Sequence, residues 1–403
     1  MKKLFTKVAL LAGISFFITS CNKNNDAEPA DDGQEFRYVR VLISDETTNQ
    51  VSLINPRDLS VQTFQAKFHK SALYTTESGR FGGLVHRDNN MLETFDSGFE
   101  SHGDHVDVKG TPKFGALLGQ SKLPTHFKSK KGEIMTFNDG DGTLSVGKET
   151  DVHTNGMQLK QIPTGNVAHH GAMATFLNGT YAVTEKDGSI AGTLPERVKI
   201  IDNTGKLLFA SKVATKGIHG NATDGKYAVF GSASGILVIE ATGEQKLIPY
   251  PEGFGTAWFG TIYETSESGK FVGYTGAKGA YLIDVAMSKV TPIIENTDIM
   301  QCKMDFAEGV LIALLHSGEV KIYDVKANTL KTSGKIIDAV DKLDTQKPQL
   351  VATQRNLYVT LPKTGELLKV ETAKLTNTQK IKVSNTPYRI AILGAEMNRK
   401  GEE

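Results

Sequence analysis

A unit of about 40 to 50 residues recurs along this chain and constrains its fold more than any other feature of the sequence. Each unit contains a short apolar strand, a turn with a glycine, a second strand, another glycine turn and a third strand. The first turns contain, in chain order, Gly79, Gly132, Gly179, Gly225, Gly269, Gly309 and Asn356. Glycine and asparagine both tolerate the left-handed backbone of a tight turn, so we expect this conformation at all seven positions.

A second set of turns follows the same period. These turns are Asp141-Gly142, Asp187-Gly188, Ser234-Gly235, Lys278-Gly279, Ser317-Gly318 and Thr364-Gly365. The strands after them alternate in part between apolar and polar residues, as in Val320-Lys321-Ile322-Tyr323, which is the pattern of half-buried strands. Units of this length with about four short strands are typical of propeller blades. The sequence therefore predicts an all-β, eight-bladed β-propeller, with seven blades as the fallback.

The two ends of the chain together supply one blade. Seven units are complete, and residues 39–64 would form the outer strands of an eighth, with residues 388–393 as its innermost strand. Pairing the chain ends in this way closes the ring and leaves no open edge between the first and last blades. We assign the propeller to residues 37–395 and expect a disordered tail over residues 396–403.

The N-terminus has the pattern of an export signal. Met1-Lys2-Lys3 precedes an apolar run over residues 8–18, and small residues then lead to Cys21. The apolar run is too short for a stable membrane-spanning helix. A cysteine at this point is typical of a bacterial lipoprotein. We therefore expect a signal peptide over residues 1–20, lipidation of Cys21 and a flexible acidic tether over residues 21–36, with the protein anchored to the cell envelope and facing the periplasm or the cell surface.

The charge balance limits the choice of partner. Loss of the three lysines of the leader leaves 43 Lys and Arg against 45 Asp and Glu, a net charge of about −2. This near-neutral balance argues against nucleic acid or anionic lipid as the main partner. Besides Cys21 the chain has only Cys302, which excludes an internal disulfide. We expect a monomer that contacts the membrane only through its anchor.

One short run concentrates potential metal ligands. The segment His102-Gly103-Asp104-His105-Val106-Asp107 places four of them within six residues, inside the longest unit. Imidazole and carboxylate groups are the ligands that Zn²⁺ accepts in tetrahedral sites. A solvated polar loop is the alternative interpretation of this run taken alone.

Other histidines recur at matching points of neighbouring units. His126 and His219 each precede the first turn glycine of their unit by six residues, at the start of an innermost strand. His169 and His170 precede Gly179 by ten and nine residues, and only one of such an adjacent pair should face the central channel. Three neighbouring blades would thus bring an imidazole to one mouth of the ring, and we expect the long loop over residues 101–108 to fold over that mouth. The alignment predicts a metal site, with zinc as the first candidate, and we interpret the scattered histidines His69, His86, His153 and His316 as surface or strand residues.

Five stretches carry a resemblance to a known family. They are SHGDHVDV (residues 101–108), LPTHF (123–127), FNDGDG (137–142), AHHG (168–171) and IHG (218–220). In this order and at these intervals they resemble the AztD-type zinc metallochaperones, which are periplasmic partners of zinc ABC importers. The resemblance spans essentially the whole mature chain. It implies an eight-bladed propeller that binds zinc and passes it to the solute-binding protein of a zinc ABC importer.

The resemblance also implies the residues of the site. They are His102, Asp104, His105, His126, His169 or His170, and His219. Because a tetrahedral ion needs only four ligands, we expect His105, His126, His169 and His219 to bind the metal, with Asp104 as a further ligand or as a residue that orients one.

Two other functions remain as alternatives to this non-enzymatic metal carrier. A propeller hydrolase or lyase would use the metal to activate water, and would need three protein ligands, an open position and a base such as Asp104 or Asp107. A metal-free propeller would use its faces to bind proteins or glycans. The alignment of histidines in three blades is the feature that speaks against this last alternative.

Overall fold

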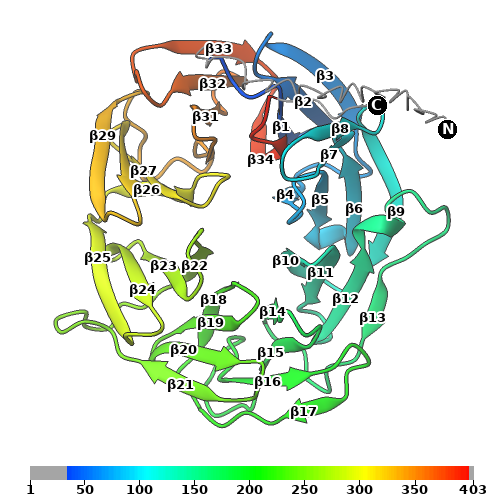
Figure 1. The fold of residues 1–403 in the computed structure, drawn as a ribbon, viewed down its shortest axis with the longest axis vertical. Coiled ribbons are helices and arrows are strands. Elements are labelled where there is room, and N and C mark those ends of the chain that lie inside the picture. Colours follow the sequence, from blue (N-terminus) through cyan, green and yellow to red (C-terminus); the bar gives the residue numbers. More distant parts are fainter. Residues whose placement is uncertain (1–33, 399–403) are drawn as a thin grey trace, which may run out of the picture. The chain divides into compact units, whose positions relative to one another are not determined.

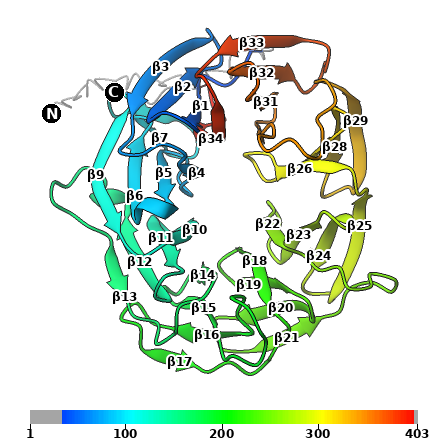
Figure 2. The same cartoon turned by 180° about the vertical axis from the view of Figure 1, so that it is seen from behind.

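The computed structural model describes residues 34–398, which form an all-β propeller of eight blades. Each blade is a four-stranded antiparallel sheet, and the eight sheets are arranged in a ring around a common axis (Figures 1 and 2). The prediction of eight blades is confirmed, and the seven-blade fallback is not needed. The described part of the chain has two short 3-10 helices, η1 (Arg87–Asn89) and η2 (Glu149–Asp151), and no α-helix. Within residues 34–398, no helix has the length and apolar character required to cross a membrane.

The strands follow one another from the axis outward in every continuous blade. Blade 2 contains β4 (Ala72–Thr75), β5 (Phe81–His86), β6 (Met91–Asp96) and β9 (Lys113–Gln120). Blade 3 contains β10 (Pro124–Lys130), β11 (Glu133–Asn138), β12 (Thr143–Lys148) and β13 (Lys160–Ile162). Blade 4 contains β14 (Met173–Thr175), β15 (Tyr181–Glu185), β16 (Arg197–Ile201) and β17 (Leu207–Phe209). Blade 5 contains β18 (Ile218–Thr223), β19 (Tyr227–Ser232), β20 (Gly235–Glu240) and β21 (Gln245–Ile248); blade 6 contains β22 (Thr261–Glu264), β23 (Lys270–Thr275), β24 (Gly279–Asp284) and β25 (Lys289–Glu295). Blade 7 contains β26 (Ile299–Met304), β27 (Val310–Leu315), β28 (Glu319–Asp324) and β29 (Thr329–Lys335); blade 8 contains β30 (Leu350–Ala352), β31 (Asn356–Leu361), β32 (Glu366–Glu371) and β33 (Thr378–Lys382). A separate hairpin of β7 (Phe99–Ser101) and β8 (Val106–Val108) lies between β6 and β9 in the sequence.

Blade 1 joins the two ends of the propeller. Its outer strands are β1 (Tyr38–Asp45), β2 (Gln50–Asn55) and β3 (Ser60–Gln65), and its innermost strand is β34 (Pro387–Ala395). β1 and β34 pair antiparallel along nearly their whole length, from Tyr38 opposite Ala395 to Asp45 opposite Pro387. The predicted closure of the ring by N- and C-terminal strands is therefore confirmed.

The predicted turns are right in position but not all in conformation. Five of the seven first turns place a glycine at positive φ, and all six second-turn glycines also have positive φ. The prediction was wrong at Gly309 and Asn356, neither of which adopts positive φ. In blade 7 the residue before the glycine, Glu308, takes the left-handed position with φ 59. In blade 8 the backbone N–H of Asn356 donates to Thr353 Oγ1 at 3.0 Å, so a side chain stabilises a turn that needs no left-handed residue.

The hydrophobic core consists of layers between adjacent blades. In one layer Ala174 and Phe176 of blade 4 contact Phe230 and Leu237 of blade 5, and all four are fully buried. The central strands of each blade are covered on both faces, which explains why strands such as β19 and β31 are buried along nearly their whole length and do not alternate between buried and exposed residues. The neighbouring sheets thus hold each blade, and the innermost strands, in fixed positions.

The chain topology gives the ring two distinct faces. Each continuous blade has four antiparallel strands, so the next innermost strand always begins at the same end of the channel. We call this end the top face, and we call the end where the innermost strands finish the bottom face. Consecutive innermost strands contact each other around the channel, including β10 with β14, β14 with β18 and β34 with β4.

The boundaries of the propeller extend beyond the predicted residues 37–395. Glu35 is fully buried, and its Oε2 accepts hydrogen bonds from Thr353 Oγ1 (2.6 Å), Asn356 Nδ2 (3.0 Å) and the Tyr358 hydroxyl. The expected tether over residues 21–36 therefore cannot include Glu35. At the other end Met397 packs against a small apolar cluster, so it belongs to the propeller and not to the tail expected over residues 396–403. The signal peptide, Cys21 and the rest of the tether lie outside the described residues.

We predict that Glu35→Ala destabilises the folded propeller by about 2–4 kcal/mol, because three buried donors of blade 8 lose their acceptor. Urea unfolding measures this loss, with the exposed Glu252→Ala as a control that should change stability by less than about 0.5 kcal/mol. Equal effects of the two substitutions would contradict the role assigned to Glu35.

Candidate metal centre

Three histidines from three consecutive blades meet at the top face. His126 is the third residue of β10, His219 is the second residue of β18, and His170 lies in the loop that leads into β14. The ring centroids are 5.0 Å apart for His126 and His170, 5.0 Å for His170 and His219, and 5.8 Å for His126 and His219. One ring nitrogen of each residue lies within 4.8 Å of the other two. We call these three residues the histidine triad.

Irregular strand pairing directs two of these side chains. The register between β10 and β11 shifts between Pro124 and Phe127, and the register between β18 and β19 shifts between Ile218 and Asn221. His126 and His219 lie within these β-bulges. An extra residue in one strand bends it and re-aims a side chain, which is why bulges recur next to functional sites.

Glycines after two of the triad histidines allow the blades to approach closely. A Cβ on Gly220 would lie 2.7 Å from the Thr261 backbone of blade 6, and a Cβ on Gly171 would lie 2.2 Å from the Phe137 ring of blade 3. Both distances are too short for any side chain. The glycine of the His-Gly pairs in AHHG and IHG is thus required for blade packing, which in turn fixes the position of the preceding histidine.

Hydrogen bonds orient two of the imidazole rings. His170 Nδ1 lies 2.7 Å from Asp139 Oδ2, and His219 Nδ1 lies 2.7 Å from the backbone oxygen of Gly260. Because a carboxylate and a carbonyl can only accept, both Nδ1 atoms carry the proton, and both Nε2 atoms keep a free lone pair. An acceptor on the far nitrogen is the arrangement that orients histidine ligands of metals.

His126 is held neutral by its surroundings. Its Nε2 is buried and has no hydrogen-bond partner among the described residues. Burial, reinforced by the neighbouring His170 and His219, lowers the pKa of His126 to about 3. An imidazole that stays unprotonated at neutral pH and has an unpaired nitrogen is suited to bind a cation. Burying a polar nitrogen without a hydrogen-bond partner costs free energy, and a bound cation would offset that cost.

Asp139 was missed by the sequence reasoning, which assigned only the glycine turn Asp141-Gly142 to this segment. The segment does form the turn between β11 and β12 (Glu133–Asn138 and Thr143–Lys148), but Asp139 is nearly fully buried and reaches His170 in the next blade. Burial alone would raise the pKa of Asp139, but hydrogen bonds from His170 and Thr125 hold it below its usual range. Arg87 Nη2 lies 3.5 Å from the same Asp139 oxygen and its Nε donates to Thr125 Oγ1 at 3.3 Å. Only the recurrence of the FNDGDG stretch among the resembling motifs hinted at a role for Asp139.

His169 lies apart from the triad. Its Nδ1 bonds the backbone oxygen of Val167 at 2.8 Å, its Nε2 bonds Thr184 Oγ1 at 3.1 Å, and its ring packs edge-on against Phe137. Both nitrogens are therefore engaged in the core of blade 4. As expected, one residue of the adjacent pair joins the other histidines, but it is His170 and not the expected His169.

The remaining predicted ligands form a second group on the β7–β8 hairpin. His102, His105 and Asp107 each offer a ligand atom within 4.8 Å of the others, and Asp104 Oδ1 lies 2.7 Å from His105 Nδ1. The expectation that this loop covers the triad is wrong. The hairpin follows the end of β6, where Phe95 is aligned through Gly82 of β5 with Thr75 at the end of innermost strand β4, and so it stands on the bottom face.

The other histidines have structural partners. His86 Nε2 lies 2.8 Å from Glu93, His153 Nε2 lies 2.7 Å from Asp96, and His316 Nδ1 lies 2.9 Å from the Val340 backbone oxygen. His69 is exposed at the surface. Cys302 is a buried thiol within the core layer between blades 6 and 7, and burial raises its pKa to about 12. It does not belong to either group of candidate ligands.

Below the triad, the channel opens to the bottom face through a cavity of about 720 Å³. Lys128, two residues after His126 on β10, and Lys303 on β26 line this cavity, and burial lowers the pKa of both. Glu308, Glu264 and Lys130 also line the cavity, with Lys130 Nζ 3.4 Å from Glu264. Half-buried lysines and a group of carboxylates thus share the channel between the triad and the bottom face.

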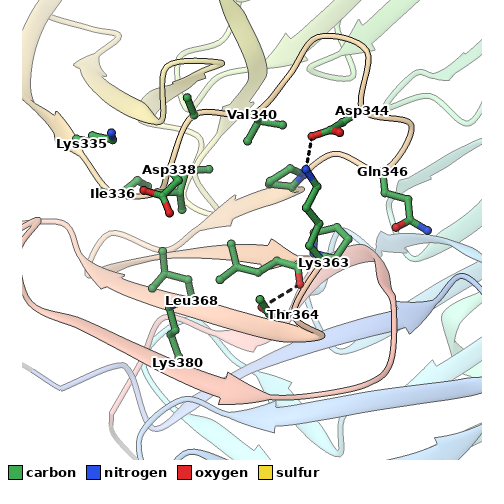
Figure 3. Close-up of a pocket in the computed structure, with 15 residues that line it drawn as sticks. Lys335, Ile336, Asp338, Val340, Asp344, Gln346, Lys363, Thr364, Leu368 and Lys380 are labelled. Atoms are coloured by element: carbon green, nitrogen blue, oxygen red, sulfur yellow. Dashed lines mark hydrogen bonds and ion pairs between the residues drawn. The ribbon is translucent and has the colours of Figure 1, made fainter.

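A second cavity, of about 630 Å³, lies on the top face at blades 7 and 8 (Figure 3). Ile336, Val340 and Leu368 line it. Lys363 Nζ and Asp344 Oδ2 form an ion pair of 2.7 Å at this cavity, which is drawn as a dashed line in Figure 3. None of the predicted ligands lines this cavity, so it is separate from the candidate metal centre.

Comparison with known proteins gives relatives of the same fold at low sequence identity. No protein-family profile matches the chain. The chain is 24% identical to the zinc chaperone AztD of Citrobacter koseri over 389 residues, which cover 93% of this chain and 91% of that protein. A crystal structure of C. koseri AztD has a TM-score of 0.81 at 21% identity and covers 91% of this chain and 100% of that chain. The apo structure of the same protein has a TM-score of 0.78 at 20% identity, over 88% of this chain and 98% of that one.

A more distant structural neighbour is the dihydro-heme d1 dehydrogenase NirN, with a TM-score of 0.58 at 13% identity over 91% of this chain and 77% of that chain. At such identities a structural likeness establishes the fold alone. The predicted resemblance to AztD-type proteins is confirmed by the sequence match and the two AztD structures together.

We predict that Glu308→Gln gains stability relative to the native protein as the pH rises from 5 to 8. Burial, with repulsion from Glu264, raises the pKa of Glu308 to about 7, whereas an unfolded glutamate titrates near 4.3. The Glu308 side chain makes its full contribution to the free energy of unfolding below about pH 4.3, and this contribution is lost as the pH rises through 7. Glutamine does not ionise, so the variant does not lose stability in this way. Urea unfolding at the two pH values should show the relative gain growing by about 1–2 kcal/mol after solvent screening. A difference that does not change with pH would contradict this assignment.

Proposed function

We propose that this chain, which resembles AztD in sequence and in fold, is a zinc-binding chaperone that holds Zn²⁺ at His126, His170 and His219. The observation that carries this proposal is the meeting of three imidazoles from three blades, with one ring nitrogen of each within 4.8 Å of the other two and with Nδ1 of His170 and of His219 bonded to an acceptor. Zinc accepts imidazole nitrogen at about 2.0–2.1 Å in four-coordinate sites. Three ligands leave the fourth position open.

An open coordination position suits a protein that gives up its metal. A closed four-ligand site holds zinc as a structural element, whereas an incoming ligand of an acceptor protein can enter an open position before the donor ligands leave. The triad lies at the mouth of the channel and not at its centre, because its residues are at the start of their strands. We propose the solute-binding protein of a zinc ABC importer as the acceptor, as the resemblance implies.

The charged neighbours of the triad can set its affinity. The Asp139 carboxylate makes His170 a better electron donor, which strengthens zinc binding. Arg87 shares the same carboxylate oxygen and places a positive charge beside the site, which weakens binding. In this proposal the opposing effects of Asp139 and Arg87 set an affinity for zinc that still allows transfer to an acceptor protein.

The same open position could serve a hydrolase that activates a metal-bound water, and one feature favours the chaperone. A hydrolytic site needs a carboxylate free to act as a base beside the metal. Asp139, the carboxylate that reaches the triad, accepts a hydrogen bond from the Nδ1–H of His170 and thus orients a ligand. Asp104 and Asp107, the bases considered from the sequence, lie on the opposite face. We therefore propose that the protein is not an enzyme.

The proposed location follows from the N-terminal sequence. We propose that Cys21 carries a lipid that tethers the propeller to the cell envelope, on the periplasmic side or at the cell surface. The described residues begin at Gln34, after the proposed anchor. The propeller would then act as a monomer close to a membrane-bound importer.

We predict that the double variant His126→Ala/His219→Ala loses the triad-bound zinc. Elemental mass spectrometry after zinc loading and desalting measures the metal content per chain. The native protein should exceed the variant by about one zinc per chain, because one remaining imidazole cannot hold the ion. The control His69→Ala/His316→Ala removes two histidines outside the triad and should keep the native metal content. Equal metal content in the native protein and the triad variant would rule out this site.

We predict that Asp139→Asn lowers zinc affinity about 10- to 100-fold, as loss of an orienting carboxylate does at other histidine sites. Competition with a fluorescent chelator measures the affinity, and Asp141→Asn in the same turn serves as control because Asp141 bonds Thr143 and not a histidine.

We predict that Arg87→Gln raises the affinity for zinc, measured by the same competition. If Arg87 acts through Asp139, its effect should shrink in the Asp139→Asn background. An equal effect in both backgrounds would show direct repulsion of the ion instead.

A further inference from the structure

Five carboxylates line the cavity of about 720 Å³ that opens on the bottom face. Blades 1, 2, 6 and 7 contribute them, and they are Glu77, Glu264, Asp305, Glu308 and Glu396. The ammonium groups in the same lining are those of Lys128, Lys130 and Lys303. Carboxylates thus outnumber ammonium groups by five to three, and a concave surface with an excess of one charge attracts ligands of the opposite charge.

One lysine neutralises two of these carboxylates. Lys130 Nζ lies 3.0 Å from Glu77 Oε1 and 3.4 Å from Glu264 Oε2. Lys128 Nζ donates to the backbone oxygen of Asn221 at 2.9 Å. Within residues 34–398, no lysine or arginine forms an ion pair with the other three carboxylates. We call these three, Asp305, Glu308 and Glu396, the acidic trio.

Asp305 brings a buried oxygen without a partner to this cavity. The residue is 4% exposed, and its Oδ1 accepts the N–H groups of Gly309 and Val310, both at 2.8 Å, which closes the first turn of blade 7. Thr353 closes the equivalent turn of blade 8 with a single hydroxyl oxygen, so the turn does not require the second oxygen of Asp305. That oxygen, Oδ2, has no hydrogen-bond partner among the described residues. Burying it unpaired costs free energy, and a bound cation would offset that cost.

Glu308 is held near half ionisation at neutral pH by its surroundings. Desolvation in the channel, with repulsion from Glu264, Asp305 and Glu77, raises the pKa of Glu308 to about 7. The charge of Lys130 opposes this shift without cancelling it. A further positive charge in the cavity would therefore favour the ionised form of Glu308.

Glu396 responds in the same way. Burial, with repulsion from Asp305 and Glu35, raises the pKa of Glu396 to about 7. This happens although Gln354 donates its backbone N–H at 2.6 Å and its side-chain amide at 3.3 Å to the Glu396 carboxylate. Burial also raises the pKa of Asp305. The acidic trio therefore holds protons that a bound cation would displace.

The spacing of the trio suits an extended organic cation and not a metal ion. Among the described residues, groups of three or more ligand atoms close enough to share an ion occur in the triad and on the β7–β8 hairpin, and not in this cavity. Tyr74, Met304 and Phe306 give the cavity wall an apolar part. The cavity volume is within the range of about 300–1,000 Å³ that is typical of small-molecule sites. A methylene chain with an ammonium group at each end matches separated carboxylates along an apolar wall.

We propose that the bottom-face cavity binds an aliphatic polyamine, whose ammonium groups pair with the acidic trio while its methylene chain lies against Met304 and Phe306. The polyamine enters from the bottom face, whereas the triad lies at the top mouth of the channel. This binding activity goes beyond the function proposed for the triad and does not depend on it.

Isothermal titration of the purified full chain with putrescine tests this proposal. Both putrescine amines stay protonated between pH 6 and 8, since alkyl amines titrate near 10.4. Affinity should rise about 10- to 100-fold from pH 6 to pH 8, because Glu308 and Glu396 lose their protons in this interval. At pH 7, buffers of different ionisation enthalpy should show the release of about one proton per chain on binding. Butylamine, which carries one ammonium group, should bind far more weakly.

The variant Glu308→Gln/Glu396→Gln separates specific pairing from general attraction. Because glutamine resembles the protonated carboxyl, the variant should bind putrescine about 10- to 100-fold more weakly than the native protein at pH 8, with no change between pH 6 and 8. Asp305→Asn, which keeps the oxygen that closes the turn, should also weaken binding. The exposed Glu252→Gln should bind as the native protein does, and circular dichroism should show that each variant keeps the fold.

Three results would overturn the proposal. They are the absence of putrescine binding at pH 8, equal affinity of the native protein for butylamine and putrescine, and equal affinity of Glu308→Gln/Glu396→Gln and the native protein for putrescine. The variant His126→Ala/His219→Ala should lose zinc from the triad and still bind putrescine like the native protein. Loss of putrescine binding in that variant would place the amine at the triad and contradict the cavity site, so the two claims are tested separately.

Discussion

The antiparallel pairing of β1 with β34 is the interaction on which the rest of this structure depends. It joins residues more than 340 positions apart in the sequence and fixes the ring at eight blades. A closed ring holds each sheet between two neighbours, and the core layers between sheets then set the distance between adjacent innermost strands. His126, His170 and His219 can therefore meet although each belongs to a different blade. The same closure places the β7–β8 hairpin, because Phe99 packs on Tyr38 at the end of the β1–β34 pair.

Most of the fold could be predicted because its signal is periodic. Glycine turns and short apolar strands repeat in each unit, and the physical demand for a tight turn is the same in every blade. The failures at Gly309 and Asn356 are local, since Glu308 or a Thr353 side chain satisfied the turn by another route. Glu35 escaped notice because a single buried carboxylate before the first strand has no pattern in sequence, and its three partners lie in blade 8.

The site could be predicted only as far as its residues follow the repeat. His126 and His219 stand at the same offset from their turns, and that regularity placed them correctly on the top face. His169 and His170 lie in an irregular loop, where strand alternation does not decide which residue faces the channel. Asp139 was hidden because an aspartate in a turn is common and its contact with His170 crosses between blades. The face of the hairpin follows from strand parity, since a connection between the third and fourth strands of a blade lies where the innermost strands end.

These features define two separate groups of candidate metal ligands on opposite faces of the propeller. The triad is recessed, oriented by Asp139 and Gly260, and kept unprotonated at His126 by burial. The hairpin group of His102, His105 and Asp107 is partly exposed and includes a carboxylate. Lys128 and Lys303 line the channel between the two groups, together with Glu264 and Glu308.

Anomalous X-ray diffraction at the zinc edge, from crystals of the zinc-loaded protein, tests the central claim most directly. The account predicts an anomalous peak among the His126, His170 and His219 rings, about 2.0–2.1 Å from one nitrogen of each. A zinc-loaded crystal with no anomalous peak among these three rings would contradict it.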